Sequence, residues 1–356
     1  MTAPTRTSGV DTSITRSEVI DMRRAHDVII IGGGAAGLSA ALVLGRARRR
    51  VVVIDAGTPR NAPAAHMQGY LSRDGLPPAD LVAFGRAEVT GYGVELVDDT
   101  VTAIDMAVTP YDEAAPQFTV TVAGGSTFVG RQILVTTGLI DDLPDLPGIR
   151  ERWGRDVLHC PYCHGWEVRD RRLGVLGTHA AAGTHAQLIR QWSDDVTFFV
   201  HTYDLDHTER AAMEARGIRI VTGEIDRLVI ENDHVTSVRL VDGSLVDLDA
   251  VFVRPGTRPR PDGLLARLGC EPVATGFVGV DPAGRTAVPG VWAAGNAVDP
   301  RAQVITAAGQ GSAAAIGINS ELTDDDIRQA LRWTTQFGGV ANRSEAGAVA
   351  RRLGLD

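Results

Sequence analysis

The chain has 356 residues, of which 44% are hydrophobic and 22% are charged, so it is long enough for two globular domains. Its formal net charge of -9 argues against nucleic acid or an anionic membrane surface as the main partner. The sequence contains no lysine, which excludes catalysis through a lysine Schiff base.

The first 25 residues contain no apolar core and three acidic residues, so they match neither a secretory signal nor a transit peptide. We expect this segment to be a flexible tail. No run of about 18 apolar residues occurs, so no membrane span is predicted. Three cysteines are too few for the disulfide scaffold of a small secreted protein, and we expect the chain to be cytoplasmic.

A strand, turn, helix, strand unit begins the first expected domain. Residues 26–31 form a continuous apolar run, residues 38–50 have helical spacing, and residues 51–55 read as a second strand. Gly32, Gly34 and Gly37 lie in the intervening turn as G-x-G-x-x-G, and Asp55 ends the second strand. Such glycines permit a tight turn, admit a pyrophosphate and allow close packing, while the aspartate accepts hydrogen bonds from a ribose. This unit predicts a dinucleotide site.

A second unit of the same kind follows. Residues 171–192 read as strand, glycine turn and helix, and residues 195–201 as the next strand. His179 occupies the position where the backbone should approach a pyrophosphate, and no arginine occurs between His201 and Arg210 to bind a 2'-phosphate. Two interpretations remain, a working NADPH site or a retained fold that has lost its site, and we favour the second.

Between the two units lies "VLHCPYCHGWE", residues 157–167, with Cys160 and Cys163 in a C-x-x-C pattern flanked by His159 and His164. Zinc would need four ligands, and the only other cysteine is the distant Cys270. An inert buried pair is a further possibility. A reversible disulfide fits best, because C-x-x-C lowers the pKa of one thiol and histidine can carry the protons that thiol chemistry moves.

Four segments together, "IGGGAAG", "ILVTTG", "CPYCHG" and "GVWAAGNAVDPRAQVITAAGQG", resemble the low-molecular-weight thioredoxin reductase family over roughly residues 26–325. The resemblance implies an α/β fold with two Rossmann-like, three-layer ββα dinucleotide-binding domains. It also implies a discontinuous FAD-binding domain, an inserted degenerate NAD(P)-like domain that carries the C-x-x-C, and a homodimer. The expected divisions are 1–25 (tail), 26–143 and 255–330 (FAD domain), 144–254 (insert) and 331–356 (C-terminal extension).

The same resemblance implies that FAD is the cofactor and which residues bind it. Asp55, Arg60 and Asn61 would hold its ADP half, and Asn296 and Gln303 would reach its ribityl chain and ring. In chain order, the expected FAD-binding residues are Gly32, Gly34, Ala36, Gly37, Asp55, Arg60, Asn61, His66, Val101, Thr137, Gly138, Gly295, Asn296, Gln303 and Val304.

Departures from the reductase pattern point to a subgroup. Reductases have an aspartate straight after the second cysteine, where this chain has His164, and arginines where it has Thr202 and Tyr203. The "CPYCHG" form is similar to the FAD-dependent dithiol oxidases of gliotoxin and holomycin biosynthesis. This resemblance implies oxidation of a small-molecule dithiol to a disulfide with oxygen as acceptor. The alternatives are a thioredoxin reductase that uses NADPH or ferredoxin, and a non-catalytic flavin-bound redox sensor.

The expected catalytic residues are Cys160 and Cys163, with His164 as the preferred proton carrier and His159 as the second choice. We expect Trp166 to pack against the flavin domain and Cys270 to be a buried filler. No metal is expected.

Overall fold

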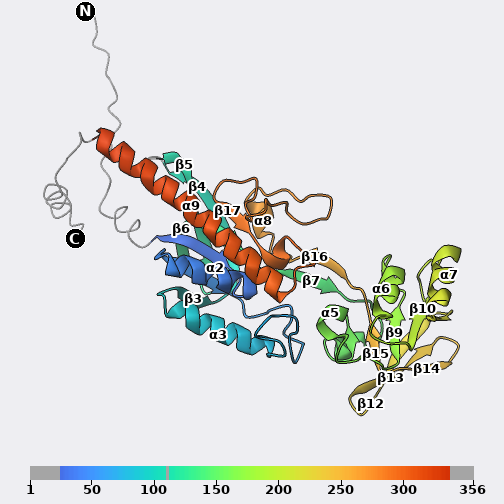
Figure 1. The fold of residues 1–356 in the computed structure, drawn as a ribbon. Helices are drawn as coiled ribbons and strands as arrows, with labels where there is room; N and C mark the ends of the chain where they lie inside the picture. Colours follow the sequence, from blue (N-terminus) through green and yellow to red (C-terminus); the bar gives the residue numbers. More distant parts are fainter. Residues whose placement is uncertain (1–24, 110–111, 337–356) are drawn as a thin grey trace, which may run out of the picture.

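The computed structural model describes residues 25–109 and 112–336, which form two lobes joined by two strands (Figure 1). The first lobe is built on a sheet of seven strands in which β1 (His26–Ile31) lies parallel to β2 (Val51–Asp55) on one side and to β6 (Thr127–Val135) on the other. All residues of β1 after His26 are buried, because the sheet is covered on both faces. The remaining strands of the sheet are β3 (Glu95–Asp98), β4 (Val101–Thr109), β5 (Asp112–Val122) and β17 (Val291–Ala293).

Helices of the first lobe follow the sequence pattern with shifted ends. The glycine turn leads into α2 (Ala35–Arg46), which packs against the long α9 (Val304–Gln336). Gly311 of α9 allows this close packing, since an added Cβ would lie 2.0 Å from the Ala36 carbonyl oxygen. The other helical segments of this lobe are α3 (Pro78–Thr90), α8 (Leu264–Arg267) and the short 3-10 helix η1 (Gly295–Ala297).

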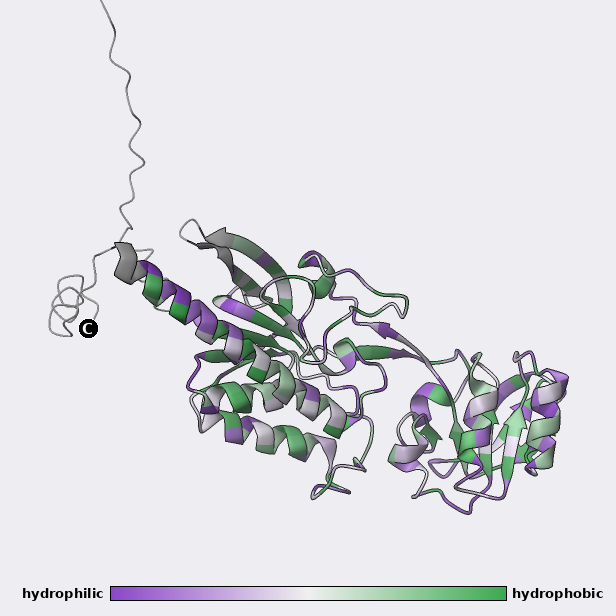
Figure 2. Ribbon diagram, turned by 45° about the horizontal axis from the view of Figure 1, so that its top comes forward, coloured by the Kyte–Doolittle hydropathy of each residue, from purple (hydrophilic) through white to green (hydrophobic). Residues whose placement is uncertain are grey.

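The second lobe contains a parallel sheet of five strands, in the order β11-β10-β9-β15-β8, and an antiparallel sheet of three strands. The parallel strands are β8 (Val157–Leu158), β9 (Leu173–Leu176), β10 (Val196–Phe199), β11 (Arg219–Val221) and β15 (Ala250–Phe252). The antiparallel strands are β12 (Ile225–Glu231), β13 (His234–Leu240) and β14 (Leu245–Asp247). The helices are α4 (Ile149–Arg152), α5 (Pro161–His164), α6 (Ala182–Ile189) and α7 (His207–Ala215). Figure 2 shows that the strands of both lobes are largely hydrophobic.

Two strands, β7 (Leu139–Asp142) and β16 (Gly256–Pro259), pair antiparallel and connect the lobes. They lie where we expect the chain to leave and re-enter the FAD domain, and we keep that division as our assignment of domains. The predicted α/β fold class with two Rossmann-like lobes is confirmed.

The ends of the chain lie largely outside the described residues. Helix α9 continues through Gln336, past the expected start of the C-terminal extension at residue 331. The expected tail up to residue 24 and residues 337–356 fall outside the part that the structure describes. Among the described residues, no helix is both long and apolar enough to cross a membrane.

Candidate active site

Cys160 and Cys163 form a disulfide at the start of a single helical turn. Cys160 caps α5, and its carbonyl oxygen accepts hydrogen bonds from the amides of Cys163 and His164, each at 3.1 Å. Pro161 occupies the first helical position, where no amide donor is needed. The turn brings the two Cα atoms to 5.2 Å, a separation that suits a disulfide.

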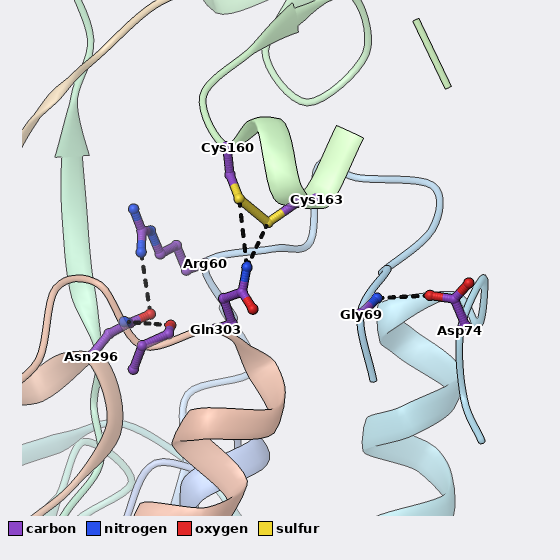
Figure 3. The surroundings of a disulfide bond; sticks show 8 residues. Arg60, Gly69, Asp74, Cys160, Cys163, Asn296 and Gln303 are labelled. Carbon is purple, nitrogen blue, oxygen red and sulfur yellow. Dashed lines mark hydrogen bonds between the residues drawn. A yellow bond between two sulfur atoms is a disulfide. The ribbon is translucent and has the colours of Figure 1, made fainter. Parts of the chain in front are cut away.

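The disulfide faces the other lobe. Figure 3 shows the Gln303 side chain, at the residue before α9, pointing at the two sulfur atoms. Its Nε2 lies 3.9 Å from each Sγ and donates to both. Gln303 was expected to contact FAD, and the structure places its side chain against the disulfide of the second lobe. Its amide can therefore interact with a sulfur that becomes negatively charged when the disulfide opens.

Arg60 links three segments beside this contact. Its guanidinium forms two hydrogen bonds with the Asp141 carboxylate of β7, at 2.8 and 2.6 Å, and a third with Asn296 Oδ1 at 3.3 Å. Asn296 in turn donates to the carbonyl oxygens of Asp299 and Ala302. Arg60 and Asn296 were expected to contact FAD, and in this structure they fasten the connecting strand β7 to the FAD lobe.

The glycine turn between β1 and α2 has the shape of a dinucleotide site. An added Cβ at Gly32 would lie 2.5 Å from the Thr136 carbonyl oxygen, and one at Gly37 would lie 1.9 Å from the Gly32 carbonyl oxygen. At Gly34, which caps α2, an added Cβ would meet nothing. Helix α2 also has no acidic residue in its first turn and no side-chain cap. Its first amide donors are therefore free for a pyrophosphate, and the turn fits FAD.

The other expected FAD-binding residues differ in how close they lie to this turn and in how far they are buried. Asp55 ends β2, with its carboxylate carbon 2.8 Å from where a Cβ at Gly33 would lie. A Cβ added at Gly295 would lie 3.1 Å from the Ala36 Cβ. Partly buried positions are held by Asn61, Val101, Thr137, Gly138 and Val304, whereas His66 is exposed and its Nδ1 lies 3.0 Å from the Gly75 carbonyl oxygen. The structure brings the glycines, Ala36, Asp55 and Gly295 together.

His159 lies half-buried between Cys160 and a second histidine, His185, with ring centroids 6.3 Å apart. Burial, and then the charge of Arg60, lowers the pKa of His159 to about 4, against the opposing effect of Asp141. The ring hydrogen-bonds to the backbone of Val253, and its buried Nδ1 has no partner among the described residues. At neutral pH this imidazole is uncharged and has a free nitrogen.

His164 and Trp166 follow Cys163 in the sequence. Burial lowers the pKa of His164, and the Glu167 carboxylate opposes that shift. Trp166 is 66% exposed, so the expectation that it packs against the flavin domain is wrong. The reason is local: α5 ends at His164, and the Arg169 guanidinium lies over the indole at 4.0 Å.

Cys270 is buried and contacts Thr286, as expected for a filler.

The second glycine turn is filled by the protein's own side chains. His179 Nδ1 accepts a hydrogen bond from the Ala181 amide at 3.0 Å, just before α6. Tyr203 donates to Glu209 at 2.7 Å, and both side chains lie over Gly183 in the first turn of α6. Burial, followed by this hydrogen bond, raises the pKa of Tyr203 to about 12. A carboxylate in this position repels a nucleotide phosphate.

No motif signals several of these features. Gln303 contacts a sulfur atom, and Arg60 bonds to Asp141, and in each case the two residues lie far apart in the sequence. The burial of His185 likewise depends on the fold. Among residues 25–109 and 112–336, no three metal-ligand side chains gather as a metal site would require.

Comparisons with known proteins agree with this geometry. The family model for pyridine nucleotide-disulphide oxidoreductases matches residues 26–311. "Thioredoxin reductase sirT" of Leptosphaeria maculans is 31% identical over 317 residues, covering 85% of this chain and 95% of the relative. The structure titled "Crystal structure of HlmI" has a TM-score of 0.85 at 52% identity and covers 88% of this chain and 97% of that one. A putative thioredoxin reductase TrxB from Bacillus anthracis has a TM-score of 0.79 at 30% identity, over 85% of this chain and 99% of that one.

Proposed function

Because the chain belongs to the pyridine nucleotide-disulphide oxidoreductase family and is a thioredoxin reductase-like flavin oxidoreductase, we propose that it oxidises a small-molecule dithiol to a disulfide. The electrons pass through the Cys160–Cys163 pair, and oxygen is the final acceptor. FAD is the cofactor, as in the rest of this family. Bound at the first glycine turn, it would supply a two-electron acceptor for the reduced cysteine pair, with oxygen as the final acceptor.

One observation carries the proposal: the disulfide lies at the meeting point of the two lobes, with Gln303 of the FAD lobe directed at both sulfurs. A disulfide that served only to stabilise the insert would have no need of a donor from the other lobe. The position instead suits a pair that is opened by a substrate thiol and closed again from the FAD side.

Thiol exchange at this pair follows ordinary chemistry. A substrate thiolate attacks one sulfur, a mixed disulfide forms, and the other cysteine leaves as a thiolate. The second substrate thiol then attacks the mixed disulfide and releases the cyclic product disulfide. The protein is left with two reduced cysteines, having gained two electrons and two protons. The Gln303 amide can donate to the thiolate formed at either step.

The substrate protons need an acceptor, and two histidines are available. The sequence favours His164, which stands where reductases have an aspartate. We propose His159 instead, because its buried Nδ1 has no partner among the described residues and its low pKa keeps the ring neutral. A neutral imidazole beside Cys160 can take the proton of an attacking thiol.

The direction of electron flow is supported by the second glycine turn. His179 uses the Ala181 amide as its own hydrogen-bond donor, and the Glu209 carboxylate lies over the start of α6. Both features oppose the binding of a nucleotide phosphate. We therefore propose that electrons enter through the cysteines and that NADPH is not the donor.

Anaerobic titration of the purified FAD-containing protein tests this proposal. A dithiol should bleach the flavin absorbance near stoichiometrically, whereas an equal amount of NADPH should not. Admission of oxygen should restore the absorbance and produce hydrogen peroxide. Efficient bleaching by NADPH would identify a reductase, and slow turnover with either compound would identify a sensor.

A cysteine variant separates the disulfide relay from direct attack on the flavin. Cys163→Ser should retain FAD and lower the steady-state rate by at least about a thousandfold, because no internal disulfide can form. Cys270→Ser is the matched control, since this buried thiol contacts only Thr286 among polar partners in the described structure. Wild-type turnover in Cys163→Ser would contradict the relay.

A further inference from the structure

Strand pairing places Arg254 beside the redox pair. In the parallel sheet of the insert, β15 pairs with β8 so that Val251 faces Val157 and Phe252 faces Leu158. The pairing continues one step, because the Val253 amide donates to the Leu158 carbonyl oxygen at 2.8 Å. Arg254 is the next residue after Val253, and Cys160 is the second residue after Leu158, so the two residues lie in neighbouring segments just beyond the paired strands.

On its other side, Arg254 adjoins the second glycine turn. Strand β15 also pairs with β9, with Phe252 facing Val175, so Arg254 lies at the level of Gly177. The boundary between β9 and β15 is the switch point of this sheet, since β10 and β11 lie beyond β9 and β8 lies beyond β15. Open parallel sheets bind ligands at the carboxyl ends of their strands at such a point.

The charge of Arg254 is not neutralised by its surroundings. Its side chain is exposed, and no carboxylate within residues 25–109 and 112–336 forms an ion pair with it. Burial lowers the pKa values of His159, His179 and His185, and the charge of Arg254 is a further cause for all three. The guanidinium therefore lies within electrostatic reach of three neutral imidazoles.

Two buried polar atoms nearby also lack partners. Thr178, the residue after Gly177, has a buried Oγ1 with no hydrogen bond in the described structure. His185 is only 3% exposed, and its Nδ1 likewise has no partner there. Buried polar atoms without partners are uncommon in proteins, and a threonine hydroxyl without a partner can donate a hydrogen bond to a ligand. Thr178 follows Gly177, which strand pairing places level with Arg254, and His185 lies within electrostatic reach of Arg254.

We propose that Arg254 and Thr178 form an anion-binding subsite beside Cys160, and that the dithiol substrate carries a carboxylate that occupies it. This inference rests on the proposed function for the dithiol part of the ligand. A guanidinium binds a carboxylate with two parallel hydrogen bonds, and the threonine hydroxyl can donate a third. A larger polyanion is disfavoured, because His179 uses the Ala181 amide and the Glu209 carboxylate lies over α6.

Alkylation of Cys160 tests the subsite without any turnover. In the Cys163→Ser protein with FAD bound, Cys160 is a free thiol that reacts with iodoacetate, a carboxylate, or with iodoacetamide, its neutral counterpart. For each thiol we divide the rate with iodoacetate by the rate with iodoacetamide. We expect this ratio to be about tenfold higher for Cys160 than for free N-acetylcysteine, which is the effect of one charge-assisted hydrogen bond. Arg254→Gln in the same background should abolish this excess, and Arg254→Lys should retain part of it.

The matched control is Arg258→Gln, which removes an arginine of β16 that already pairs with Asp142 at 2.8 Å. This variant should leave the ratio unchanged. The subsite would be refuted if Arg254→Gln kept the excess, or if it slowed both reagents equally, which would mean that Arg254 affects the thiol and not the carboxylate. Flavin absorbance and circular dichroism verify that each variant is folded.

A second measurement tests the substrate class. Dihydrolipoate and dihydrolipoamide differ only in a carboxylate and an amide. We expect kcat/KM to be about tenfold higher for dihydrolipoate, through KM, and Arg254→Gln to remove the difference. Equal values in the wild type would overturn the substrate class while leaving dithiol oxidation intact. If neither dithiol is oxidised, the proposed function fails, and the alkylation ratio still decides whether the subsite exists.

Discussion

The two histidines that flank the cysteine pair have different surroundings. His159 is held by the Val253 backbone and has a buried, unpartnered Nδ1, whereas His164 ends a single helical turn near the Glu167 carboxylate. Only the first has both a fixed ring and a free acceptor atom. This contrast can be tested at the level of single side chains.

The pH profile should distinguish the two histidines. If neutral His159 takes the substrate proton, kcat/KM for a dithiol should change by less than about threefold between about pH 5.5 and about pH 7.5, because the ring with its pKa of about 4 stays neutral throughout. In His159→Gln, only preformed thiolate reacts, and kcat/KM should rise about tenfold per pH unit. The matched variant His164→Gln should keep the flat profile, and a flat profile in His159→Gln would exclude His159.

The residue types alone could not show which of the two histidines is the better proton acceptor. "HCPYCH" supplies two histidines at similar distances from the cysteines, and a family pattern favours His164. The burial of His159 depends on Val253 and His185, which lie on other segments of the insert. Trp166 illustrates the same limit, because its exposure results from the short α5 and the stacked Arg169.

At the level of secondary-structure elements, two glycines at the start of α2 have different surroundings. Gly37 packs against the preceding turn, while Gly34 leaves open space at the helix cap. A substitution at Gly37 should therefore affect stability, whereas a substitution at Gly34 should affect cofactor binding.

Two alanine variants test this separation. Gly37→Ala should lower the free energy of unfolding of the FAD-free protein by about 3 kcal/mol, because its Cβ overlaps the Gly32 carbonyl oxygen. Gly34→Ala should change that stability by less than about 1 kcal/mol. It should nevertheless weaken FAD binding at least about tenfold, since its methyl group enters the space for the pyrophosphate. Urea unfolding and flavin fluorescence titration measure the two effects, and unchanged FAD affinity in Gly34→Ala would contradict the assigned site.

Element boundaries were predictable where apolar runs define them. Strands β1 and β2 match the predicted residues 26–31 and 51–55, because continuous buried strands need unbroken apolar runs. The helix predicted over residues 38–50 instead spans Ala35–Arg46. It starts in the small residues after the glycine turn, and it ends before Arg48, whose φ of 63° is left-handed, although the arginine-rich sequence gives no stop signal.

At the scale of the whole molecule, polar contacts join the two lobes beside the connecting strands β7 and β16. The Arg60–Asp141 pair holds β7 to the FAD lobe, and the disulfide meets Gln303 across the boundary. The buried histidines of the insert add a dependence of stability on pH. His159 and His185 both have a pKa of about 4, lowered mainly by burial, against about 6.5 in an unfolded chain.

The free energy of unfolding should fall as the pH decreases from about 6.5 to about 4. In this range the unfolded chain binds protons that the folded chain does not, so the stabilisation present above pH 6.5 is lost progressively. Urea unfolding between about pH 7 and about pH 4 measures this slope. His185→Leu should make it shallower, because the buried side chain no longer titrates. His207→Gln, at an exposed position of α7, should leave it unchanged, and an equal slope in all three proteins would contradict the assignment.

The sequence by itself determined the local features: the glycine turn typical of FAD binding, the C-x-x-C that forms a disulfide, and the altered second turn at His179. These features depend on residues a few positions apart, whose spacing fixes their geometry. Only the tertiary structure placed Gln303 on the two sulfurs, joined Arg60 to Asp141 and brought Arg254 into a segment neighbouring that of Cys160. Those contacts depend on which strands pair and how the lobes meet, and burial of apolar surface across the whole chain decides both.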